Sequence, residues 1–184
     1  GKFEQGINNV ISRRIAGFSS LVAIVSENTL NSYDFEDIWT IFHEVVRRGD
    51  TFVFDLKSTR EDCKHLWMSP QIRTYVAVSD GKILGTYILR NNQPGLGAHV
   101  ANGAYMVHLE ARRLGIGRAM GMHSIKEAKK LGFSAIQFNF VVSTNLVAVQ
   151  LWLKLGFKIV GTVPKAYNHK KLKLVDIYVM HRFV

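Results

Sequence analysis

The feature that most constrains the fold of this chain is the segment Val107–Arg118, with the sequence VHLEARRLGIGR. It joins an apolar strand to a long helix through a turn that holds two glycines. Such a turn leaves main-chain N–H groups without partners at the positive end of the helix, where phosphate is stabilised. Glycine also lets a ligand approach the main chain, because a Cβ atom would block it. With three arginines in seven residues, the segment predicts a site for a phosphate-bearing cofactor.

The charge of the chain is concentrated in the half that contains this turn. The formal net charge is +10. Residues 1–92 carry 11 basic and 11 acidic side chains, whereas residues 93–184 carry 13 basic and 3 acidic ones. The basic half attracts anions, which fits general solubility, a polyanionic cofactor or a nucleic acid. We favour the cofactor because the charge and the turn lie in the same half.

Length and composition indicate one globular domain over residues 1–184, without repeats or linkers. The single cysteine, Cys63, excludes an internal disulfide framework and fits the reducing cytoplasm. No apolar run approaches the roughly 18 residues that a membrane helix needs. Arg13 and Arg14 interrupt the apolar region near the start, so no secretory pattern is seen. These features predict a cytoplasmic protein without a membrane segment.

Hydrophobic periodicity predicts a mixed sheet with helices on both faces, an α/β (α+β) architecture. The dipeptide Asp80-Gly81 predicts a hairpin turn. The expected elements are helices over 34–48, 60–68 and 116–131, strands over 73–78, 82–90, 104–109 and 135–142, a helix opened by Asn145 and closed by Gly156, and strands over 157–161 and 174–182. Residues 91–103 are expected to form a loop, and a lysine-rich loop is expected between the last two strands. The expected buried stripe of the third helix is Ala119, Met122, Ile125, Ala128 and Leu131.

Several cofactor motifs are excluded. A dinucleotide turn would place a third glycine at position 120, where Met120 stands, and no acidic residue follows about 20 positions on. A triphosphate loop needs Gly-Lys-Ser or Gly-Lys-Thr, which is absent. The seven histidines show no metal-ligand spacing, and one cysteine cannot support a zinc cluster. We therefore expect no metal.

Two motifs resemble those of the GCN5-related N-acetyltransferase (GNAT) family. The family signature V-x-P-x-x-Q/R-x-x-G-x-G/A appears here as Val107-x-Leu109-x-x-Arg112-x-x-Gly115-x-Gly117, with the proline replaced. The segment from Asn145 to Phe157 is similar to the family's N-x-x-A-x-x-L-Y-x-x-x-G-F, with Trp152 in place of the tyrosine. The resemblance covers roughly residues 73–184. It implies the GNAT fold, a central mixed and mostly antiparallel sheet of about seven strands.

The resemblance implies acetyl-CoA as cosubstrate and assigns residues to it. The pantetheine arm would pair with the main chain of Val107 and Leu109, and Asn145 would contact that arm or the reacting thioester. Asn145 also suits a helix cap, and one residue can serve both roles. Arg112 is expected on the phosphate side, although a surface charge explains it too. The pyrophosphate would lie on the main-chain N–H groups of Arg113, Leu114, Gly115, Ile116, Gly117 and Arg118.

The proton chemistry is harder to assign. Family members often place a glutamate near the start of the fourth strand, but residues 97–103 offer only His99 and Asn102, which we take as candidate substrate-binding residues. Histidine is a common general base in enzymes, although a solvated loop histidine explains His99 equally well. The family's tyrosine protonates the departing thiolate, whereas an indole N–H is no practical proton source. Either no residue replaces that tyrosine, or Tyr167 or Tyr105 does; Tyr167 is a further candidate on the substrate side.

A weaker resemblance involves the segment Phe138–Asn145. It is similar to a branch of the family that includes fungal acetyltransferases acting on the proline analogue azetidine-2-carboxylate, which also carry the tryptophan. By that analogy Asn139 would bind substrate and Asn145 would polarise or hold the reacting group, so both are candidate catalytic residues. A polar group satisfied between two diverging strands explains Asn139 equally well.

The function predicted is acetyl-CoA-dependent N-acetylation of a small-molecule amine or amino acid, by direct transfer in a ternary complex. Trp152 and the missing carboxylate leave a second hypothesis open, a CoA-binding regulatory or interaction module without turnover. Nucleic-acid binding rests on charge alone, and we expect none. The last strands can pair between two copies, which would give a homodimer. The acceptor is not identified by any motif in residues 1–70.

Overall fold

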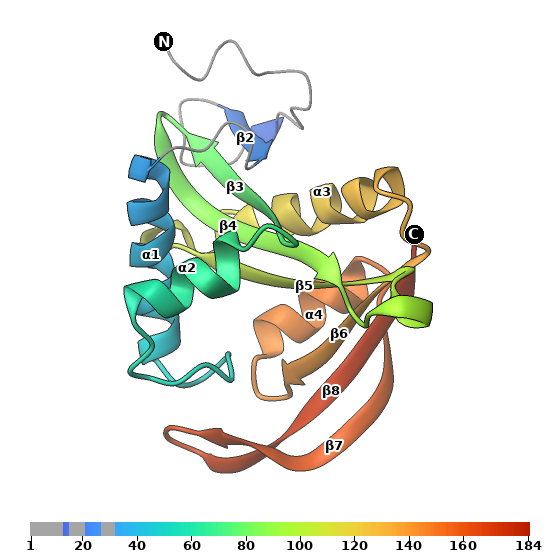
Figure 1. The fold of residues 1–184 in the computed structure, drawn as a ribbon. Coiled ribbons are helices and arrows are strands. Elements are labelled where there is room, and N and C mark those ends of the chain that lie inside the picture. Colours follow the sequence, from blue (N-terminus) through green and yellow to red (C-terminus); the bar gives the residue numbers. More distant parts are fainter. Residues whose placement is uncertain (1–12, 15–20, 27–31) are drawn as a thin grey trace.

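The computed structural model describes residues 13–14, 21–26 and 32–184, which form a twisted sheet flanked by helices (Figure 1). The helices are α1 (Ser32–Arg47), α2 (Arg60–Met68), α3 (Ile116–Lys130) and α4 (Leu146–Lys154), with one-turn 3-10 helices η2 (Gly95–Gly97) and η3 (Leu109–Ala111). The strands are β1 (Arg13–Arg14), β2 (Leu21–Ser26), β3 (Arg73–Ser79), β4 (Lys82–Asn91), β5 (Val100–Val107), β6 (Ala135–Val142), β7 (Lys158–His169) and β8 (Lys173–Phe183). Within these residues no helix is long and apolar enough to cross a membrane.

The strands form one sheet in the order β1-β2-β3-β4-β5-β6-β8-β7. Only β5 and β6 pair in parallel, and every other neighbouring pair is antiparallel. Because β1 has two residues, seven strands make up almost the whole sheet. The expected mixed, mostly antiparallel sheet is therefore confirmed.

Local signals located the first half of the chain well. Asp80 and Gly81 both have positive φ, 50° and 72°, as a tight hairpin turn between β3 and β4 requires. Helix α2 matches its expected bounds because Thr59 and Asp62 form a capping box. Helix α1 spans Ser32–Arg47 and thus begins two residues before the expected 34–48, with Asp34 in its first turn. Cys63 is fully buried, and burial raises the pKa of its thiol to about 12.

Strand β5 differs from its expected position. We expected a strand over 104–109 after a long loop, but β5 spans Val100–Val107, and Leu109 begins the 3-10 helix η3. The loop prediction was wrong because it took Gly103 as a loop residue. Gly103 lies in the strand opposite Leu89, where a Cβ atom would come within 3.0 Å of the Ile88 carbonyl oxygen and of the Tyr105 hydroxyl. Close strand packing therefore explains this glycine.

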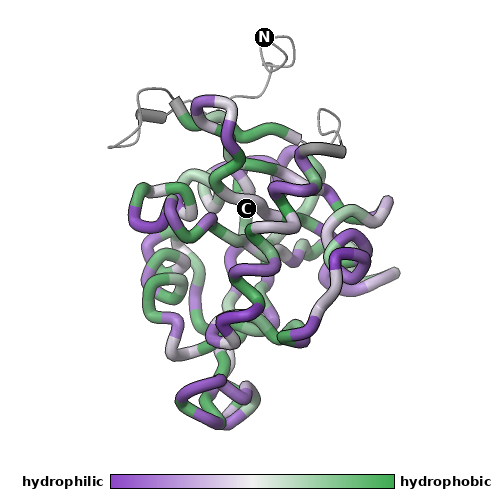
Figure 2. Tube along the Cα trace, turned by 90° about the vertical axis from the view of Figure 1, so that its left-hand side faces the viewer, coloured by the Kyte–Doolittle hydropathy of each residue, from purple (hydrophilic) through white to green (hydrophobic). Residues whose placement is uncertain are grey.

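The last two strands are longer than expected and form a hairpin that extends beyond the other strands (Figure 1). The lysine-rich stretch expected as a loop is mostly strand. Pro164 is tolerated because β7 is an edge strand. A register shift follows Val163, where Lys165 has a φ of 52° and its N–H donates to Asp176 Oδ1 at 2.9 Å. The projecting end, at the bottom of Figure 2, carries hydrophilic residues such as Lys170 and Lys171.

Two hydrophobic clusters cover the two faces of the sheet. Helices α1 and α2 pack on one face around Phe42 and Trp67, and α3 and α4 pack on the other around Met120 and Trp152. The expected stripe of α3 was partly wrong. Leu131 is exposed and Met122 and Ile125 are half-buried, whereas the buried face includes Met120, His123 and Ser124. The two polar residues are buried because tyrosine hydroxyls of the sheet bond them, Tyr87 to His123 Nδ1 at 2.5 Å and Tyr105 to Ser124 Oγ at 2.8 Å.

Candidate active site

Strands β5 and β6 diverge, and the divergence creates the candidate site. Their parallel ladder holds only Val100 opposite Ala135 and Ala101 opposite Ile136. Strand β5 continues to pair with β4 on its other side as far as Val107. The edge of β5 after Ala101 that faces β6 therefore has backbone groups outside any ladder of the described strands. An extended, amide-bearing ligand can pair along such an edge.

The glycine turn lies where this open edge ends. Arg113 and Gly115 have positive φ, 64° and 81°, and Gly115 is the N-terminal cap of α3. The first intrahelical bond runs from the Ala119 N–H to the Gly115 carbonyl at 3.0 Å. The N–H groups of residues 116–118 thus precede the hydrogen-bonding pattern of the helix. Together with the helix dipole, they suit an anionic group such as a pyrophosphate.

Gly115 and Gly117 are glycines for different physical reasons. A Cβ atom at Gly115 would meet nothing within 4 Å, so its positive φ explains the residue. Gly117 lacks a positive φ, and a Cβ there would make ordinary contacts, 3.5 Å to Leu151 and 3.8 Å to Val107. The protein itself therefore has room for a side chain at position 117. Close approach of a ligand to the main chain would explain the glycine, and in this respect the turn fits the expected cofactor.

The side chains of the signature segment separate into two groups. Ile116 is buried and Val107 and Leu114 are half-buried against the same core, so these three residues can offer a ligand their main chain rather than their side chains. Arg113 and Arg118 are exposed. We expected an extended Leu109 to pair with the pantetheine arm like Val107, but its position in η3 excludes a continuous strand there.

Arg112 lies near the loop that follows α1. Burial and the neighbouring Arg48 lower the pKa of its guanidinium, and Asp50 acts in the opposite direction. Arg48 itself bonds Asp50 Oδ2 through Nε at 3.0 Å and Nη2 at 2.7 Å. The charges of Arg48 and Asp50, both in that loop, are thus close enough to act on Arg112.

A row of side-chain amides crosses the opening between β5 and β6. Asn102 Nδ2 donates to the Gln137 carbonyl oxygen at 3.0 Å, one residue beyond the last ladder pair. Gln137 Nε2 donates to Asn139 Oδ1 at 2.9 Å, and Asn139 Nδ2 donates to Asn92 Oδ1 at 2.7 Å. The ladder of β6 with β8 shifts register between Phe138 and Val141, so Asn139 lies in a bulge. Such bulges redirect side chains next to functional sites.

Asn145 is the N-terminal cap of α4, as the sequence indicated. Its Oδ1 accepts from the Ala148 N–H at 3.4 Å, and its own N–H donates to the Val142 carbonyl at 3.0 Å. The half-buried side chain therefore has a structural role at the open end of β6. Its Nδ2 group makes no hydrogen bond within the described residues, so a ligand contact remains compatible with the capping role.

The three predicted substrate-side residues are not brought together. Asn102 lies at the point of divergence, but His99 precedes the two ladder pairs and is exposed on their far side, so it does not join the amide row. Its carbonyl accepts the Ser134 N–H at 2.9 Å. Tyr167, expected in a loop, is a buried residue of β7. Its hydroxyl donates to the Phe52 carbonyl at 3.1 Å, and its ring lies 6.2 Å from that of Phe140.

Trp152 is buried in an aromatic cluster. Its ring centroid lies 4.7 Å from that of Tyr105 and 4.6 Å from that of Phe138. A Cβ atom at Gly121 of α3 would lie 3.0 Å from Trp152 and 2.6 Å from Leu155, so this glycine permits close packing of α3 on α4. The Tyr105 hydroxyl donates to Ser124, and burial raises its pKa far above the usual value. Tyr105 and Tyr167 therefore both use their hydroxyl protons in protein hydrogen bonds.

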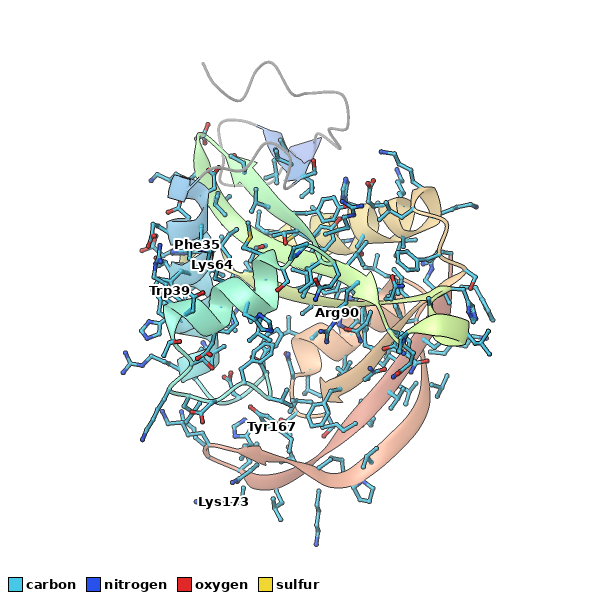
Figure 3. The ribbon with its side chains drawn as sticks, viewed as in Figure 1. Phe35, Trp39, Lys64, Arg90, Tyr167 and Lys173 are labelled. Atoms are coloured by element: carbon cyan, nitrogen blue, oxygen red, sulfur yellow. The ribbon has the colours of Figure 1, made fainter. Side chains whose placement is uncertain are left out.

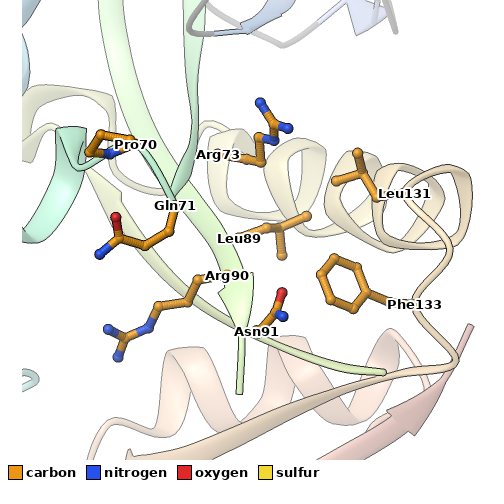
Figure 4. A pocket seen from close by; sticks show the side chains of 8 residues that line it. All are labelled: Pro70, Gln71, Arg73, Leu89, Arg90, Asn91, Leu131 and Phe133. Carbon is orange, nitrogen blue, oxygen red and sulfur yellow. The ribbon is translucent and has the colours of Figure 1, made fainter. Parts of the chain in front are cut away.

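No cluster of three metal-ligating side chains exists among the residues that the structure describes. A pocket of about 220 Å³ lies at the end of β4 remote from the glycine turn (Figure 4). Arg90 and Gln71 line one side of it, and Leu131 and Phe133 line the other. None of its lining residues was a predicted site residue.

Sequence reasoning missed Gln137 and Asn92. Gln137 carried a signal, because it lies two residues before Asn139 in the same strand and therefore shares its face. Asn92 carried none, since a loop residue can lie beside any strand. Only the fold brings Asn92 to Asn139.

Comparison with known proteins gives a consistent result. The model of the "Acetyltransferase (GNAT) family" matches residues 34–157. N-acetyltransferase aca1 of Schizosaccharomyces pombe is 28% identical over 172 residues, which cover 84% of this chain and 82% of that protein.

Solved structures agree with the sequence comparisons. A GCN5-related N-acetyltransferase from Kribbella flavida shares 43% identity at a TM-score of 0.83, covering 89% of this chain and 98% of that one. A GNAT superfamily phosphinothricin acetyltransferase from Sinorhizobium meliloti, solved in complex with acetyl-CoA, has a TM-score of 0.78 over 89% of this chain and 88% of that one. At 17% identity, that second likeness concerns the fold alone.

Proposed function

This chain belongs to the GNAT family of N-acetyltransferases, and on that premise we propose that it transfers the acetyl group of acetyl-CoA to a small-molecule amine or amino acid. Transfer is direct, within a ternary complex. The acetyl-CoA complex of the related fold from Sinorhizobium meliloti supports the choice of cosubstrate. Acetyl-CoA supplies an activated thioester.

The observation that carries the proposal is the open edge of β5 that leads into the glycine turn. The edge between Ala101 and Val107 can pair with the amides of a pantetheine arm. The N–H groups of residues 113–118 and the charges of Arg113 and Arg118 can hold the phosphates. Gly117, whose glycine no protein contact requires, leaves the room for that approach.

The amide row supports an acceptor site beside this edge. We propose that Asn139 binds the acceptor and that Asn102 contributes to the same site. Asn145 holds or polarises the reacting group, since an amide N–H₂ can stabilise a developing oxyanion. Because Asn139 and Asn102 carry no charge, they bind and orient but do not remove protons.

The acceptor amine must lose a proton before it can attack the thioester. A lysine-like amine has a pKa of about 10.4, so its neutral form costs roughly 4 to 5 kcal/mol at neutral pH. Among the predicted substrate-side residues none is a carboxylate. We propose that the amine enters already neutral or loses its proton through water, with no dedicated base among these residues.

Calorimetry and a thiol-release assay test the proposal. We expect micromolar binding of acetyl-CoA and release of free CoA thiol with at least one member of a panel of amino acids, polyamines and peptide N-termini. Absence of acetyl-CoA binding would contradict the proposal. Binding without thiol release across the panel would favour the second candidate, a CoA-binding module without turnover, which the buried Trp152 and the engaged tyrosine hydroxyls support.

We also propose a cytoplasmic location and, through pairing of the β7 edge, a homodimer. We propose no role in nucleic-acid binding, since the charge has an explanation in the cofactor. Light scattering tests the homodimer, and a gel-shift experiment at low salt tests the absence of nucleic-acid binding.

A further inference from the structure

The ladder that joins β5 to β6 is short. It ends after the pairs at Val100 and Ala101, and the side chain of Asn102 adds one hydrogen bond beyond them. The strands then diverge, with α1 and α2 beside β5 and the β7–β8 hairpin beyond β6. At the open end a further connection exists, formed by Arg47, the last residue of α1, and the loop that follows it as far as residue 54. We call residues 47–54 the strap.

Three hydrogen bonds tie the strap to β7 and to the residue that follows it. The Lys170 N–H donates to the Gly49 carbonyl at 2.9 Å, and Lys170 Nζ reaches the Arg47 carbonyl at 3.4 Å. The Tyr167 hydroxyl donates to the Phe52 carbonyl at 3.1 Å. Figure 3 shows Tyr167 on the side of β7 that faces the strap. These bonds join segments more than 110 residues apart in the sequence.

Each end of this connection is anchored in a different hydrophobic cluster. On the strap, Phe52 stacks on Phe54 with ring centroids 5.8 Å apart, and Phe54 lies 5.4 Å from Phe42 in the cluster beneath α1. On the hairpin, Tyr167 is buried with Val142 and Ile177 in a separate cluster. A shift at the tie therefore changes the distance between two packed bodies rather than the position of one loose loop.

The strap is shaped to fit the hairpin. Gly49 has a φ of 62°, and a Cβ atom there would lie 3.0 Å from Lys170 Cβ and 3.1 Å from Leu56 Cδ2. Glycine thus permits both the turn after α1 and the close approach of Lys170.

The strap also contains buried polar atoms without a partner in the described part of the chain. Asp50 Oδ1 and Thr51 Oγ1 are buried without a hydrogen-bond partner among the described residues. Burial of an acceptor without a donor is unfavourable. Docking of the strap therefore depends on the few bonds to Tyr167 and Lys170, and loss of one of them should have a measurable effect.

We propose that Tyr167 and Lys170 are positioning residues that hold the strap and thereby set the width of the acceptor side of the cleft. Tyr167 acts through the Phe52 carbonyl and not as a proton donor to the thiolate, because its hydroxyl proton is used in that bond. The inference rests on the proposed acetyl transfer. It predicts that loosening the tie weakens acceptor binding while the acetyl-CoA turn, on the other side, is unaffected.

Tyr167→Phe tests the inference, because it removes one hydroxyl and keeps the ring. We expect the amide of Lys170 to exchange with deuterium at least fivefold faster. The KM of the best acceptor in the panel should rise about fivefold, the equivalent of one neutral hydrogen bond. The kcat and the acetyl-CoA dissociation constant should stay within twofold. Tyr178→Phe is the matched control, since this half-buried tyrosine of the neighbouring strand has no hydroxyl partner in the described residues.

A second variant acts on the other side of the tie. Gly49→Ala should produce the same pattern because its methyl group pushes Lys170 away, whereas Gly81→Ala, with a φ of 72° and nothing within 4 Å, should not. An unchanged deuterium-exchange rate of the Lys170 amide in Tyr167→Phe would show that Tyr167 does not hold the strap. A fall in kcat at constant KM would overturn the positioning role in favour of acid catalysis. If acetyl-CoA does not bind or no acceptor reacts, the proposed function fails, and the exchange rate still decides whether Tyr167 holds the strap.

Discussion

The proposed cofactor side and the proposed acceptor side of the opening between β5 and β6 are built in opposite ways. The cofactor side consists of one contiguous segment, Val107–Arg118, in which a strand end, a glycine turn and a helix start follow each other directly. The acceptor side that we propose draws on the strap, Asn92, Asn102, Asn139 and Tyr167, which hydrogen bonds connect to distant segments. Each of the latter positions depends on contacts between distant segments.

This difference has a consequence for robustness. The N–H groups of the turn are positioned by local backbone geometry and by α3, so a single distant substitution should leave them in place. The acceptor side changes whenever any of its separate segments moves. Arg112 lies at the junction, since it ends the cofactor segment's 3-10 turn and shares its surroundings with Arg48 and Asp50 of the strap.

The largest effect is expected from breaking the cofactor side. Gly115→Val combined with Gly117→Val should weaken acetyl-CoA binding at least about 100-fold, because the side chains block the main-chain N–H groups and lost charge-assisted bonds are worth about 1.5 to 3 kcal/mol each. Calorimetry measures the change. The control is Gly132→Val at the other end of α3, where φ is also positive, 86°, and nothing lies within 4 Å. Equal binding in the double variant and the control would remove the site from this turn.

An intermediate effect is expected from the amide row. Asn139→Ala should lower kcat/KM for the best acceptor about tenfold, the equivalent of roughly 1.4 kcal/mol, because a substrate-binding amide is lost. Acetyl-CoA affinity should be unchanged, which would separate the two sides of the cleft experimentally. Asn168→Ala provides the control, since Asn168 is an exposed asparagine of β7. A parallel loss of acetyl-CoA affinity would mean that Asn139 serves both sides.

The smallest effect concerns the support beneath α3. Burial lowers the pKa of His123 from its ordinary value of 6.5, so the unfolded chain binds its proton more readily than the folded one. Stability from this group is therefore complete above pH 6.5 and declines as the pH falls below it. The difference in unfolding free energy between the wild type and His123→Gln should shrink from pH 7.5 to pH 5.5 in urea denaturation. Ile125→Val, which changes a half-buried residue of the same helix without a titratable group, is the control and should show no such trend.

Elements fixed by interactions between neighbouring residues were predicted correctly from the sequence, and elements fixed by contacts between distant segments were not. Helix α2 and strand β6 were located at their observed bounds because capping and alternation act within a few residues. Gly103 and the lysine-rich stretch of β7 were misassigned because their conformation depends on partners, Ile88 and Tyr105 for one and β8 for the other. The buried face of α3 is rotated relative to the expected stripe, because the hydroxyls of Tyr87 and Tyr105 bond the buried side chains of His123 and Ser124. A hydrophobic pattern cannot anticipate buried polar residues.

The range of the interactions also separates the cofactor turn from the acceptor-side residues. The sequence by itself determined the family and the sheet with its helices, and it predicted the glycine turn as the cofactor site, because each depends on residues close together in the chain. The tertiary structure alone decided that His99 lies apart from the amide row, that Asn92 joins Asn139, and that Tyr167 bonds the strap. The Asn92–Asn139 and Tyr167–Phe52 hydrogen bonds join residues 47 and 115 positions apart, and packing of the whole sheet, rather than any local preference, brings them within hydrogen-bond distance.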